Sequence, residues 1–497
     1  MRLRTIVSCG QMRELDRYTI QEQKLASGIL MERAALAVVE QLEREEGTLG
    51  RVLVVCGAGN NGGDGVAVGR LLHLKGYRVE LYCLGDFERY SPDLRLQLEI
   101  AGNYRVPLVN NPRWSEYTTI VDAIFGVGLT REVAGSYRET ILQMNETSAR
   151  KVAVDIPSGL DGDSGQVLGC AVRADETVTF AFLKKGLCLY PGCEYAGEIR
   201  TADIGIYEKG WEETADYIHA LEDGDVAGLL PRRKGNGNKG TFGKVLFVAG
   251  SSQMAGAAYL SASACLHSGA GMVKIHTPEE NRVILQSLLP EALLSTYREE
   301  EREFGQLRDD LKWADVVVAG PGLGQGDLAG ERLQVALKCN RKPLVLDADG
   351  LNLFSRHPHW GELLPQTCVF TPHLMEMTRL TGETLPRVQQ DLAGQAGRFA
   401  HRNRVICVLK DARTVVAAPD GRKWLNLSGN SGMATAGSGD VLSGMVAALL
   451  AGQGEPAQMA ALAVYLHGRA GDVARKKKGS RSMTAQDLIT ALPEVLR

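Results

Sequence analysis

Short runs of apolar, often β-branched residues recur along the chain, and each ends in a turn rich in Gly, Asp or Ser. Several runs are followed by the 3.6-residue apolar periodicity of a helix. Uninterrupted apolar strands that alternate with helices indicate parallel sheets covered on both faces. The predicted strands are Arg51–Cys56, Val79–Leu84, Thr118–Ile124 and Lys151–Asp155 in the first half, and Lys244–Ala249, Val316–Ala319, Leu344–Leu346, Val369–Thr371 and Val405–Leu409 in the second.

The length of 497 residues predicts two domains or one large elaborated domain, because one ordinary hydrophobic core rarely grows so large. Charge is dense up to Asp225, and a basic, Gly-rich stretch follows from Arg232 to Gly243. We place the boundary near residue 217, which gives domains of residues 1–217 and 218–497. The Gly-rich stretch is either a linker or a mobile loop at a phosphate-binding site, and we favour the loop because it leads straight into a strand.

Charge and composition exclude several classes of partner. The net charge of -3 gives no electrostatic footprint for nucleic acid or a membrane surface, and we expect the basic run Arg475–Lys478 to lie in a solvated loop. No apolar run reaches the ~18 residues of a membrane span. The ten cysteines form no CxxC pair, which favours reduced thiols. We expect a cytoplasmic protein that assembles as a homo-oligomer.

The segment Gly57–Gly65, GAGNNGGDG, lies between a predicted strand and a predicted helix. Its glycines allow backbone N–H groups to face an anion at the helix N-terminus. Residues 57–62 also satisfy GxGxxG, and Glu80 on a later strand stands where a ribose-binding acid would lie, so a Rossmann oxidoreductase is one alternative. A purely structural turn is another. The polar side chains of Asn60, Asn61 and Asp64 argue against the dinucleotide fingerprint.

Two further strand ends carry oxygen ligands. Asp122 ends the strand of TTIVDAIFGVG, and Asp155 and Ser158 follow the next strand, in KVAVDIPSG. Either Asp alone would be read as a cap of a helix or turn. Amide, carboxylate and hydroxyl oxygens from three strand ends suit a group I or II cation better than a transition metal.

The first half resembles the YjeF N-terminal domain, or NAD(P)H-hydrate epimerase, over residues 5–215. The resemblance rests on MRELDR, LMERAA, GNNGGDG, VDAIFGVGLTR, VDIPSGLDGDSG and TVTFAFLKKGL. It implies a Rossmann-like doubly wound sheet, a K⁺ ion held by Asn61, Asp122 and Ser158, and Asp155 as the catalytic candidate for proton handling. The implied substrate-binding residues are Asn60, Asn61, Gly62, Gly63, Asp64, Gly126, Val127, Gly128, Leu129, Thr130, Arg131, Glu132 and Asp155.

In the second half, Gly437-Ser438-Gly439-Asp440 directly precedes a strongly helical run. Its N–H groups and the helix dipole can stabilise a transferring phosphoryl group, and Asp440 can take a proton from an attacking hydroxyl. A simple helix cap is the structural alternative for Asp440. The absence of GxxxxGK[ST] excludes P-loop chemistry.

The second half resembles the ribokinase-like superfamily and, within it, the ADP- or ATP-dependent NAD(P)H-hydrate dehydratase. NKGTFGKVLFVAGS, SGAGMVKI, PEAL, VVAGPGLG, LVLDADGLN, TPHLMEMTRL, VLKDARTVV, GSGD and YLHGRAGD occur in order across residues 238–472. The resemblance implies phosphorylation of the substrate hydroxyl by ADP, with Mg²⁺ on the phosphates, followed by elimination to NAD(P)H. It implies Gly322, His373 and Asp440 at the hydrated dinucleotides NADHX and NADPHX, Asp440 as catalytic base, and Lys410, Asp411, Ala412, Arg413, Thr414, Gly437, Ser438 and Gly439 at ADP.

Two departures from the dehydratase pattern affect its site. Asp411 replaces the Gly that usually follows Lys410, which puts a carboxylate near the ADP phosphates, and the PHPGE motif reads Pro372–Glu376, PHLME. Asp347 and Asp349 are further strand-end candidates to support a metal or orient substrate, although capping explains them equally well. A small-molecule kinase of the ribokinase type and a non-enzymatic binding module are the remaining alternatives.

Overall fold

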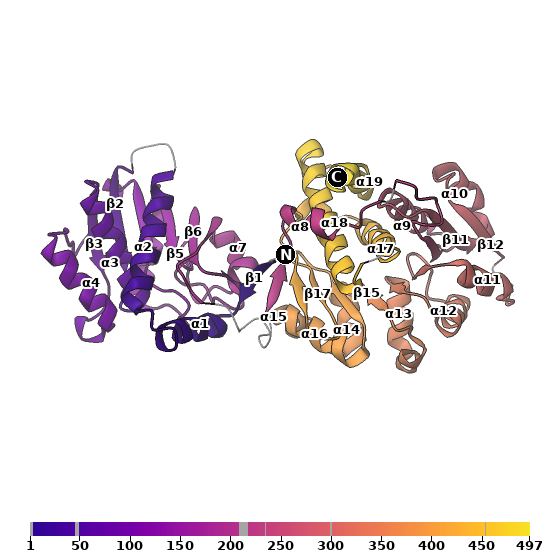
Figure 1. The fold of residues 1–497 in the computed structure, drawn as a ribbon, viewed down its shortest axis with the longest axis horizontal. Helices are drawn as coiled ribbons and strands as arrows, with labels where there is room; N and C mark the ends of the chain where they lie inside the picture. Colours follow the sequence, from indigo (N-terminus) through magenta and orange to yellow (C-terminus); the bar gives the residue numbers. More distant parts are fainter. Residues whose placement is uncertain (1–2, 45–48, 208–216, 234, 299–300, 453) are drawn as a thin grey trace. The chain divides into compact units, whose positions relative to one another are not determined.

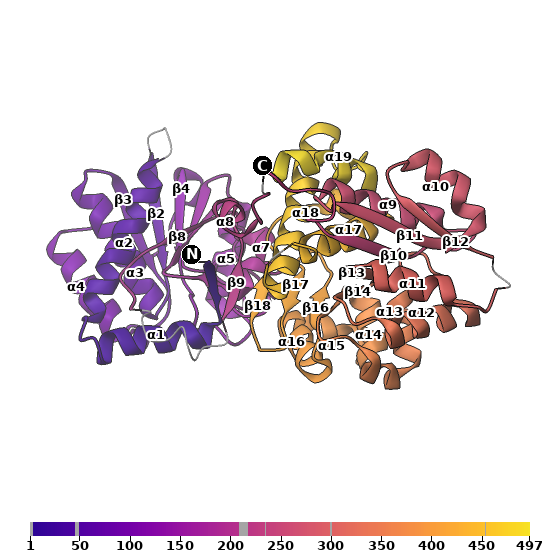
Figure 2. The same cartoon turned by 45° about the vertical axis from the view of Figure 1, so that its right-hand side comes forward.

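The computed structural model describes residues 3–44, 49–207, 217–233, 235–298, 301–452 and 454–497. The chain folds into two compact units, the first of residues 5–217 and the second of residues 218–497 with the first residues of the chain. Each unit contains strands and helices in alternation (Figures 1 and 2). The predicted α/β class is confirmed. Among the described residues, no helix combines the length and apolarity that a bilayer crossing requires.

The first unit is built on a parallel sheet with the strand order β3-β2-β4-β5-β6-β8. From β2 the chain passes to β3 on one side and then to β4 on the other, which puts the topological switch point at the carboxyl ends of β2 and β4. A short parallel pair, β1 with β7, adds to this unit. The strands are β1 (Arg4–Val7), β2 (Arg51–Cys56), β3 (Arg78–Cys83), β4 (Thr119–Ala123), β5 (Arg150–Val154), β6 (Glu176–Phe180), β7 (Leu183–Lys184) and β8 (Glu198–Ala202).

Helices cover both faces of this sheet. Along β2, Val52 and Val54 pack in the cluster that contains α2 and α3, whereas Leu53 and Val55 pack in the cluster that contains α5. This two-sided burial explains why the strand reads as an unbroken apolar run. The helices are α1 (Cys9–Gln21), α2 (Ser27–Arg44), α3 (Asn60–Leu74), α4 (Pro92–Asn103), α5 (Gly135–Glu146), α6 (Lys185–Cys188) and α7 (Gly192–Tyr195).

The second unit has a larger sheet with the order β12-β11-β10-β13-β14-β15-β16-β17-β18-β9. Neighbours from β12 to β16 are parallel, and β17 is antiparallel to both of its neighbours. The strands are β9 (Ile218–Ala220), β10 (Lys244–Val248), β11 (Met272–Pro278), β12 (Leu293–Tyr297), β13 (Val316–Ala319), β14 (Leu344–Leu346), β15 (Cys368–Phe370), β16 (Ile406–Leu409), β17 (Val415–Ala417) and β18 (Lys423–Leu425).

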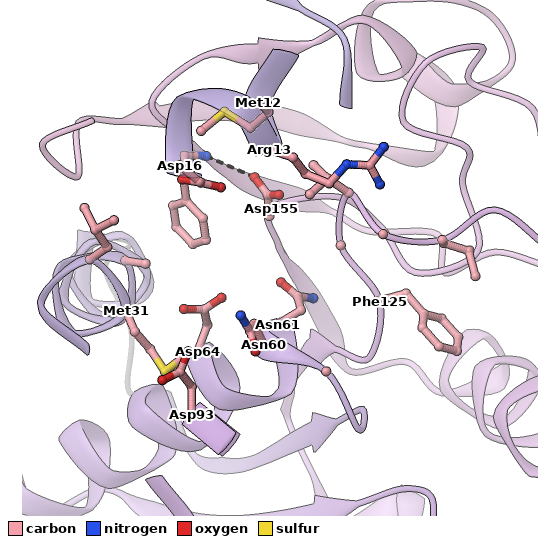
Figure 3. A pocket seen from close by; sticks show the side chains of 18 of the residues that line it. Met12, Arg13, Asp16, Met31, Asn60, Asn61, Asp64, Asp93, Phe125 and Asp155 are labelled. Carbon is pink, nitrogen blue, oxygen red and sulfur yellow. Dashed lines mark hydrogen bonds between the residues drawn. The ribbon is translucent and has the colours of Figure 1, made fainter. Parts of the chain in front are cut away.

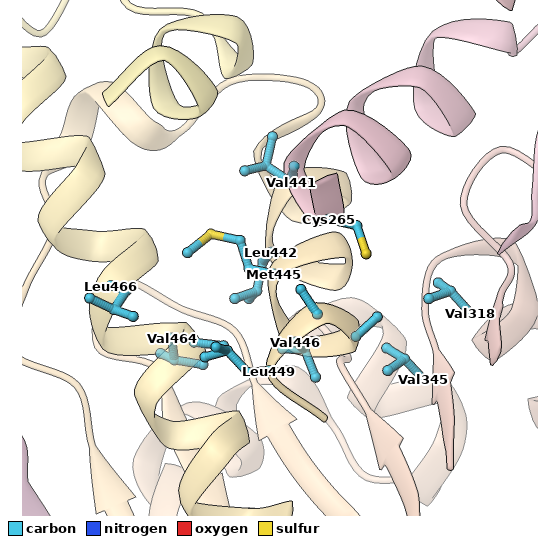
Figure 4. Packing of buried hydrophobic residues seen from close by; sticks show 14 of the residues in the cluster. Cys265, Val318, Val345, Val441, Leu442, Met445, Val446, Leu449, Val464 and Leu466 are labelled. Atoms are coloured by element: carbon cyan, nitrogen blue, oxygen red, sulfur yellow. The ribbon is translucent and has the colours of Figure 1, made fainter. Parts of the chain in front are cut away.

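The helix α17 runs through the centre of the second unit's core (Figure 4). Its residues from Val441 to Leu449 are all buried, as expected of a helix that is apolar on every side. It packs between α9 and α18 and against β13 and β14, while α11 and α16 contact the sheet elsewhere. The helices are α8 (Asp223–Leu229), α9 (Ala255–His267), α10 (Arg282–Leu288), α11 (Gly305–Trp313), α12 (Asp327–Cys339), α13 (Asp349–Arg356), α14 (Leu374–Thr381), α15 (Leu385–Gln390), α16 (Leu392–Asn403), α17 (Ser438–Leu450), α18 (Pro456–Lys478) and α19 (Ala485–Val495).

One prediction about a basic segment is wrong. The run Arg475–Lys478 is the last turn of α18 and not a loop, and its cations complement the negative end of the helix dipole. The stretch Arg232–Gly243 leads into the amino end of β10. Residue 234 of this stretch lies outside the described residues. A Cβ on Gly243 would contact Ala451, at the end of α17 opposite to Gly437. The Gly243 end of the stretch therefore lies away from Gly437, and a phosphate-binding loop at this stretch stays a prediction.

Replacing Gly444 in α17 by Ala should destabilise the second unit. The new Cβ would lie 2.0 Å from the carbonyl oxygen of Ser261 on α9, so the two helices would have to separate. Such overpacking costs about 1–3 kcal/mol. In the control Gly256→Ala on α9, no heavy atom lies within 4 Å of the new methyl group. We expect thermal unfolding to show a lower Tm for Gly444→Ala and an unchanged or higher Tm for Gly256→Ala, and the reverse order would contradict this packing.

Candidate active sites

A cavity of about 600 Å³ opens at the carboxyl edge of the first unit's sheet (Figure 3). Its walls come from α1, α2, the start of α3, the loop after β4 and the residue that follows β5. It therefore lies at the switch point, where doubly wound sheets bind ligands. Of the predicted site residues, the cavity brings together Asn60, Asn61, Asp64, Gly126, Val127, Gly128, Leu129, Thr130, Arg131 and Asp155.

Two predicted binding glycines are placed behind the cavity. A Cβ on Gly62 would lie 1.9 Å from the carbonyl oxygen of Gly57, and one on Gly63 would lie 2.7 Å from the Cε of Met31. These residues are glycines because α3 begins in close contact with its own loop and with α2. Glu132 also does not line this cavity but an adjoining one.

Asp122 and Ser158 form a buried pair beneath the cavity. The Ser158 hydroxyl donates to Asp122 Oδ1 at 2.6 Å, and the Ser158 N–H donates to Oδ2 at 2.7 Å. Burial raises the pKa of Asp122 to about 6 although these hydrogen bonds favour its ionised form. The Nδ2 atom of Asn61 is buried without a hydrogen-bond partner among the described residues. Of the three predicted cation ligands, Asn61 thus has a side-chain amide nitrogen without a hydrogen-bond partner among the described residues.

Asp155 is paired with a buried lysine that was not singled out from the sequence. Lys184 Nζ donates to Asp155 Oδ1 at 2.5 Å, to the hydroxyl of Thr179 at 3.0 Å and to the carbonyl oxygen of Phe180 at 2.8 Å, which uses all three of its donors. Asp155 adopts the left-handed conformation, with φ 68°, which costs roughly 1–2 kcal/mol. The strain and the ion pair together aim this carboxylate into the cavity (Figure 3).

Three other carboxylates, Asp16, Asp64 and Asp93, line the cavity. Burial and the neighbouring charges of Asp155, Asp16 and Asp93 raise the pKa of Asp64 well above its usual range. Burial likewise raises the pKa of Asp16 to about 6, against the opposing effect of Lys184. Sequence reasoning missed Asp16, Asp93 and Lys184. The only signals for Asp16 and Lys184 were the motifs that contain them, MRELDR and TVTFAFLKKGL.

Glu80 is not placed to bind a ribose. It is the third residue of β3, and its carboxylate accepts hydrogen bonds from Arg51 Nη2 at 3.0 and 3.1 Å and from the Tyr117 hydroxyl. The Rossmann oxidoreductase alternative therefore loses the acidic residue on which it depended.

In the second unit, the glycine-rich turn forms the start of α17. Gly437 is the N-cap residue, with φ 87°, and Asp440 lies in the first turn. The Asp440 carboxylate makes no hydrogen bond to any described residue, so the structure gives no support to a capping role. Burial first, and then the nearby charge of Asp347, raise the pKa of Asp440 to about 7.

An ion pair between the partly buried Lys410 and the buried Asp347 lies beside Asp440. Lys410 Nζ donates to Asp347 Oδ1 at 2.9 Å, and the Ser443 hydroxyl of α17 donates to Oδ2. Burial alone would raise the pKa of Asp347, but the Lys410 ammonium and these hydrogen bonds hold it below its usual value. A Cβ on Gly439 would lie 3.2 Å from Lys410 Nζ, so the ammonium adjoins the glycine-rich turn. The Lys410 ammonium and the N-terminus of α17 therefore lie close together.

His373 and Glu376 lie at the start of α14. The Nδ1 of His373 accepts from the N–H of Met375 at 3.1 Å, and Glu376 Oε2 accepts from the N–H of His373 at 2.8 Å. The imidazole is half-exposed, which leaves it accessible to a ligand. Burial raises the pKa of Glu376 to about 7, against the Lys410 charge. Glu376 is a further acidic group of this site that sequence reasoning did not identify.

Several further predicted residues flank this site: Arg413 Nη1 donates to the carbonyl oxygen of Leu427 at 2.8 Å, the Thr414 hydroxyl donates to the carbonyl oxygen of Asp411 at 3.2 Å, the Ser438 hydroxyl lies 3.4 Å from His467 Nε2, and Ala412 is exposed. Asp349 accepts hydrogen bonds from the Gly324 N–H and the Gln325 side chain, both at 2.9 Å, so it orders the loop after β13. In that loop, Gly322 has φ 61° and leaves no room for a side chain against Met254. Asp411 is exposed, so the carboxylate that replaces the expected glycine is not buried at the site.

Comparison with known proteins covers both units. A family model described as NAD(P)H-hydrate dehydratase matches residues 245–494, and one described as YjeF-related protein N-terminus matches residues 27–186. The bifunctional NAD(P)H-hydrate repair enzyme Nnr of Moorella thermoacetica is 38% identical, over 99% of this chain and 96% of its own length. The enzyme of the same name from Escherichia coli is 35% identical, over 89% of this chain and 84% of its own length.

Solved structures resemble the second unit. The ADP/ATP-dependent NAD(P)H-hydrate dehydratase of Bacillus subtilis, co-crystallised with ATP and Mg²⁺, has a TM-score of 0.50 and 30% identity, and the match covers 56% of this chain and 97% of that one. A ribokinase-like superfamily protein from Enterococcus faecalis has a TM-score of 0.50 and 32% identity, over 56% of this chain and 95% of that one. The predicted ribokinase-like fold of the second half is thereby confirmed.

Removal of the Lys184 charge should destabilise the first unit. Lys184→Met leaves the buried Asp155 carboxylate without its counter-ion, and breaking such a pair costs about 3–5 kcal/mol. The double variant Lys184→Met/Asp155→Asn carries neither charge and should recover part of the loss. Urea titrations of both variants would measure the free energy of unfolding. If Lys184→Met were as stable as the unmodified protein, the ion pair would not hold this site together.

Proposed function

This chain belongs to the family of bifunctional NAD(P)H-hydrate repair enzymes, and from that membership we propose how its two units divide the repair. The first unit interconverts the R and S epimers of NADHX and NADPHX. The second unit converts the S epimer to NADH or NADPH at the expense of ADP, which yields AMP and phosphate. The observation that carries this proposal is the Asp440 carboxylate at the glycine-rich start of α17, which makes no hydrogen bond to a described residue and lies near the Lys410 ammonium.

Epimerisation requires a carboxylate to handle protons at C6 of the hydrated nicotinamide ring. The hydroxyl on C6 is attached next to a ring nitrogen, so it can leave as water once it has gained a proton, and water can return on the other face with loss of a proton. Asp155 is our candidate to take that proton. Asp64 faces the same cavity and, with its raised pKa, can supply the proton to the leaving hydroxyl. The substrate is held by the loop of Asn60 to Asp64 and by the loop of Gly126 to Glu132.

Asn61, Asp122 and Ser158 would hold the K⁺ ion that the family implies. The donors fit, since the amide of Asn61 is buried without a partner among the described residues, and turning it over would present its oxygen in place of Nδ2. One carboxylate among neutral oxygens gives the modest field that suits a monovalent cation. When bound, K⁺ would neutralise the buried Asp122 and order the two loops that meet above it.

In the second unit, Asp440 takes the proton of the C6 hydroxyl while the oxygen attacks the β-phosphorus of ADP. A C6–O–P bond forms and the bond from phosphorus to the bridging oxygen breaks, which releases AMP. The phosphate then leaves with the C6–O bond electrons, and loss of a proton from C5 forms the double bond of NAD(P)H. Phosphate is a far better leaving group than hydroxide, which explains why a dehydration consumes a nucleotide.

The nucleotide lies against the segment of Lys410 to Thr414, with its phosphates at Gly437, Ser438 and Gly439. His373 and Gly322 contact the hydrate. Among the described residues, no three His, Cys, Asp or Glu side chains are grouped to hold a metal ion. That fits Mg²⁺, which commonly binds through substrate phosphates with few protein ligands. The ion would arrive with ADP and neutralise the charge on its phosphates.

The cysteines bear on the cellular compartment of the enzyme. All ten cysteines fall within the described residues, and no disulfide bond joins any two of them, which fits a reducing compartment. We therefore place the protein in the cytoplasm and keep self-association to a homo-oligomer as part of the proposal.

The central test is to supply the R and S hydrates separately, with and without ADP, and to follow NADH absorbance. The unmodified enzyme should form NADH from both hydrates, and only with ADP.

Asp440→Asn keeps the size of the side chain but removes the basic oxygen, so kcat should fall by ~10²–10⁴ with an unchanged Tm. Because the pKa of Asp440 is about 7 and the base acts when ionised, kcat/KM for the S hydrate should rise with pH up to about 7 and then level off.

The control for Asp440→Asn is conversion of R hydrate to S hydrate, measured by chromatography, which should be unaffected. A fully active Asp440→Asn enzyme would end the assignment of Asp440 as the base. NADH formation without ADP would contradict the phosphorylation step.

Replacing K⁺ by choline at constant ionic strength should slow epimerisation and leave dehydration of the S hydrate unchanged. Asn61→Ala should remove the dependence on K⁺ without loss of stability, because its buried Nδ2 makes no hydrogen bond to a described residue that could be lost. Epimerisation rates measured over a K⁺ titration would show both effects. A rate independent of K⁺ in the unmodified enzyme would contradict a K⁺ site.

A further inference from the structure

A second cavity, of about 640 Å³, adjoins the epimerase cavity within the first unit. The two share Gly59, Phe125, Leu129 and Arg131 as lining residues. We propose that the second cavity binds the adenosine end of the hydrated dinucleotide, while the first holds its nicotinamide end. This inference rests on the proposed epimerase function and names where the non-reacting half of the substrate is recognised.

The distribution of reactive groups between the two cavities determines which half of the substrate occupies each one. Asp155, Lys184, Asp64 and Asp16 all line the first cavity and none lines the second. The hydrated ring must therefore occupy the first. Ligand sites typically measure 300–1,000 Å³, so each cavity has room for one nucleotide half. The second cavity is the adjoining space at the same edge of the sheet.

The lining of the second cavity suits an adenosine with phosphate attached. Arg131 and Arg89 are exposed guanidinium groups that suit phosphate oxygens. Phe125 and Tyr137 have ring centroids 5.0 Å apart and offer an aromatic surface to the base. Arg131 belongs to both cavities, which places it where the pyrophosphate that joins the two halves would cross. The start of α3, at Gly59, lies at the same junction and can also contact phosphate.

Asp86 stands where doubly wound dinucleotide sites carry a ribose-binding acid. It follows β3, the neighbour of β2 at the edge of the sheet, and it lines the second cavity. Its carboxylate lies 3.9 Å from Arg89 Nε, too far for a strong ion pair, so it can still accept from the ribose hydroxyls. Glu80, the residue that the sequence suggested for this role, is engaged with Arg51 instead.

The test fills the second cavity and compares a complete with a truncated substrate. Ser136→Trp, in the exposed first turn of α5, places an indole in the second cavity only, and Glu139→Trp is the control on the same helix, outside both cavities. The substrates are the hydrates of NADH and of reduced nicotinamide mononucleotide, which lacks the adenosine end. Epimerisation of each is followed by chromatography, together with the Tm of every variant.

The unmodified enzyme should use the complete hydrate better, with a kcat/KM higher by at least about tenfold, which corresponds to about 1.4 kcal/mol. Ser136→Trp should lower kcat/KM for the complete hydrate to the level of the truncated one and leave the truncated one unchanged. Ala134→Trp, which fills the same cavity, should do the same, and Glu139→Trp should change neither substrate.

Equal use of both hydrates by the unmodified enzyme would overturn the inference, and so would equal losses on both hydrates in the cavity-filling variants. These results leave the epimerase function standing. An unmodified enzyme that epimerises neither hydrate would instead overturn the proposed function and this inference with it.

Discussion

Parallel strand pairing, buried on both faces of a sheet, is the constraint from which both sites follow. Strands buried on both faces, such as β2, must be apolar along most of their length, and parallel strands end at the same edge, so polar side chains gather where these strands end. In the first unit, the ends of β2, β4 and β5 supply Asn61, Asp122 and Asp155. In the second, the ends of β14 and β16 supply Asp347 and Lys410, and α17 brings Asp440 to them.

Each unit also carries a lysine, fully buried in the first and partly buried in the second, that pairs with a strand-end aspartate. Lys184 holds Asp155, and Lys410 holds Asp347. Such pairs are costly to bury and gain little net stability, so their value lies in the positions and charges that they fix. Ser443 extends the second pair by tying α17 to β14 through Asp347. The start of α17 is therefore set by the same group that compensates the Lys410 charge.

The strand pattern and the glycine-rich turns made the fold class predictable from the sequence, because both are local features. The places of candidate residues were predictable only where residues follow a strand closely or open a helix after a glycine-rich turn, as Asn61, Asp122, Asp155 and Asp440 do, and their roles stay predictions. Lys184, Asp16 and Glu376 were not, because a lysine within an apolar segment or an acid on a helix acquires its role from contacts that only the tertiary fold creates. Glu80 shows the opposite error, since the spacing was right but its side chain pairs with Arg51 and Tyr117.

Asp155 and Asp440, the two aspartates that we propose as proton acceptors, are held in opposite ways. Lys184, the Thr179 hydroxyl and the Phe180 N–H all converge on Asp155 Oδ1, which fixes the carboxylate and leaves Oδ2 for the substrate. The contact with Lys184 therefore fixes where the remaining oxygen of Asp155 can meet the substrate. Asp440 has no such anchor among the described residues, and its raised pKa reflects burial near other acids. General-base catalysis is most effective when the pKa of the base lies near the working pH, so the raised pKa of Asp440 suits the role proposed for it.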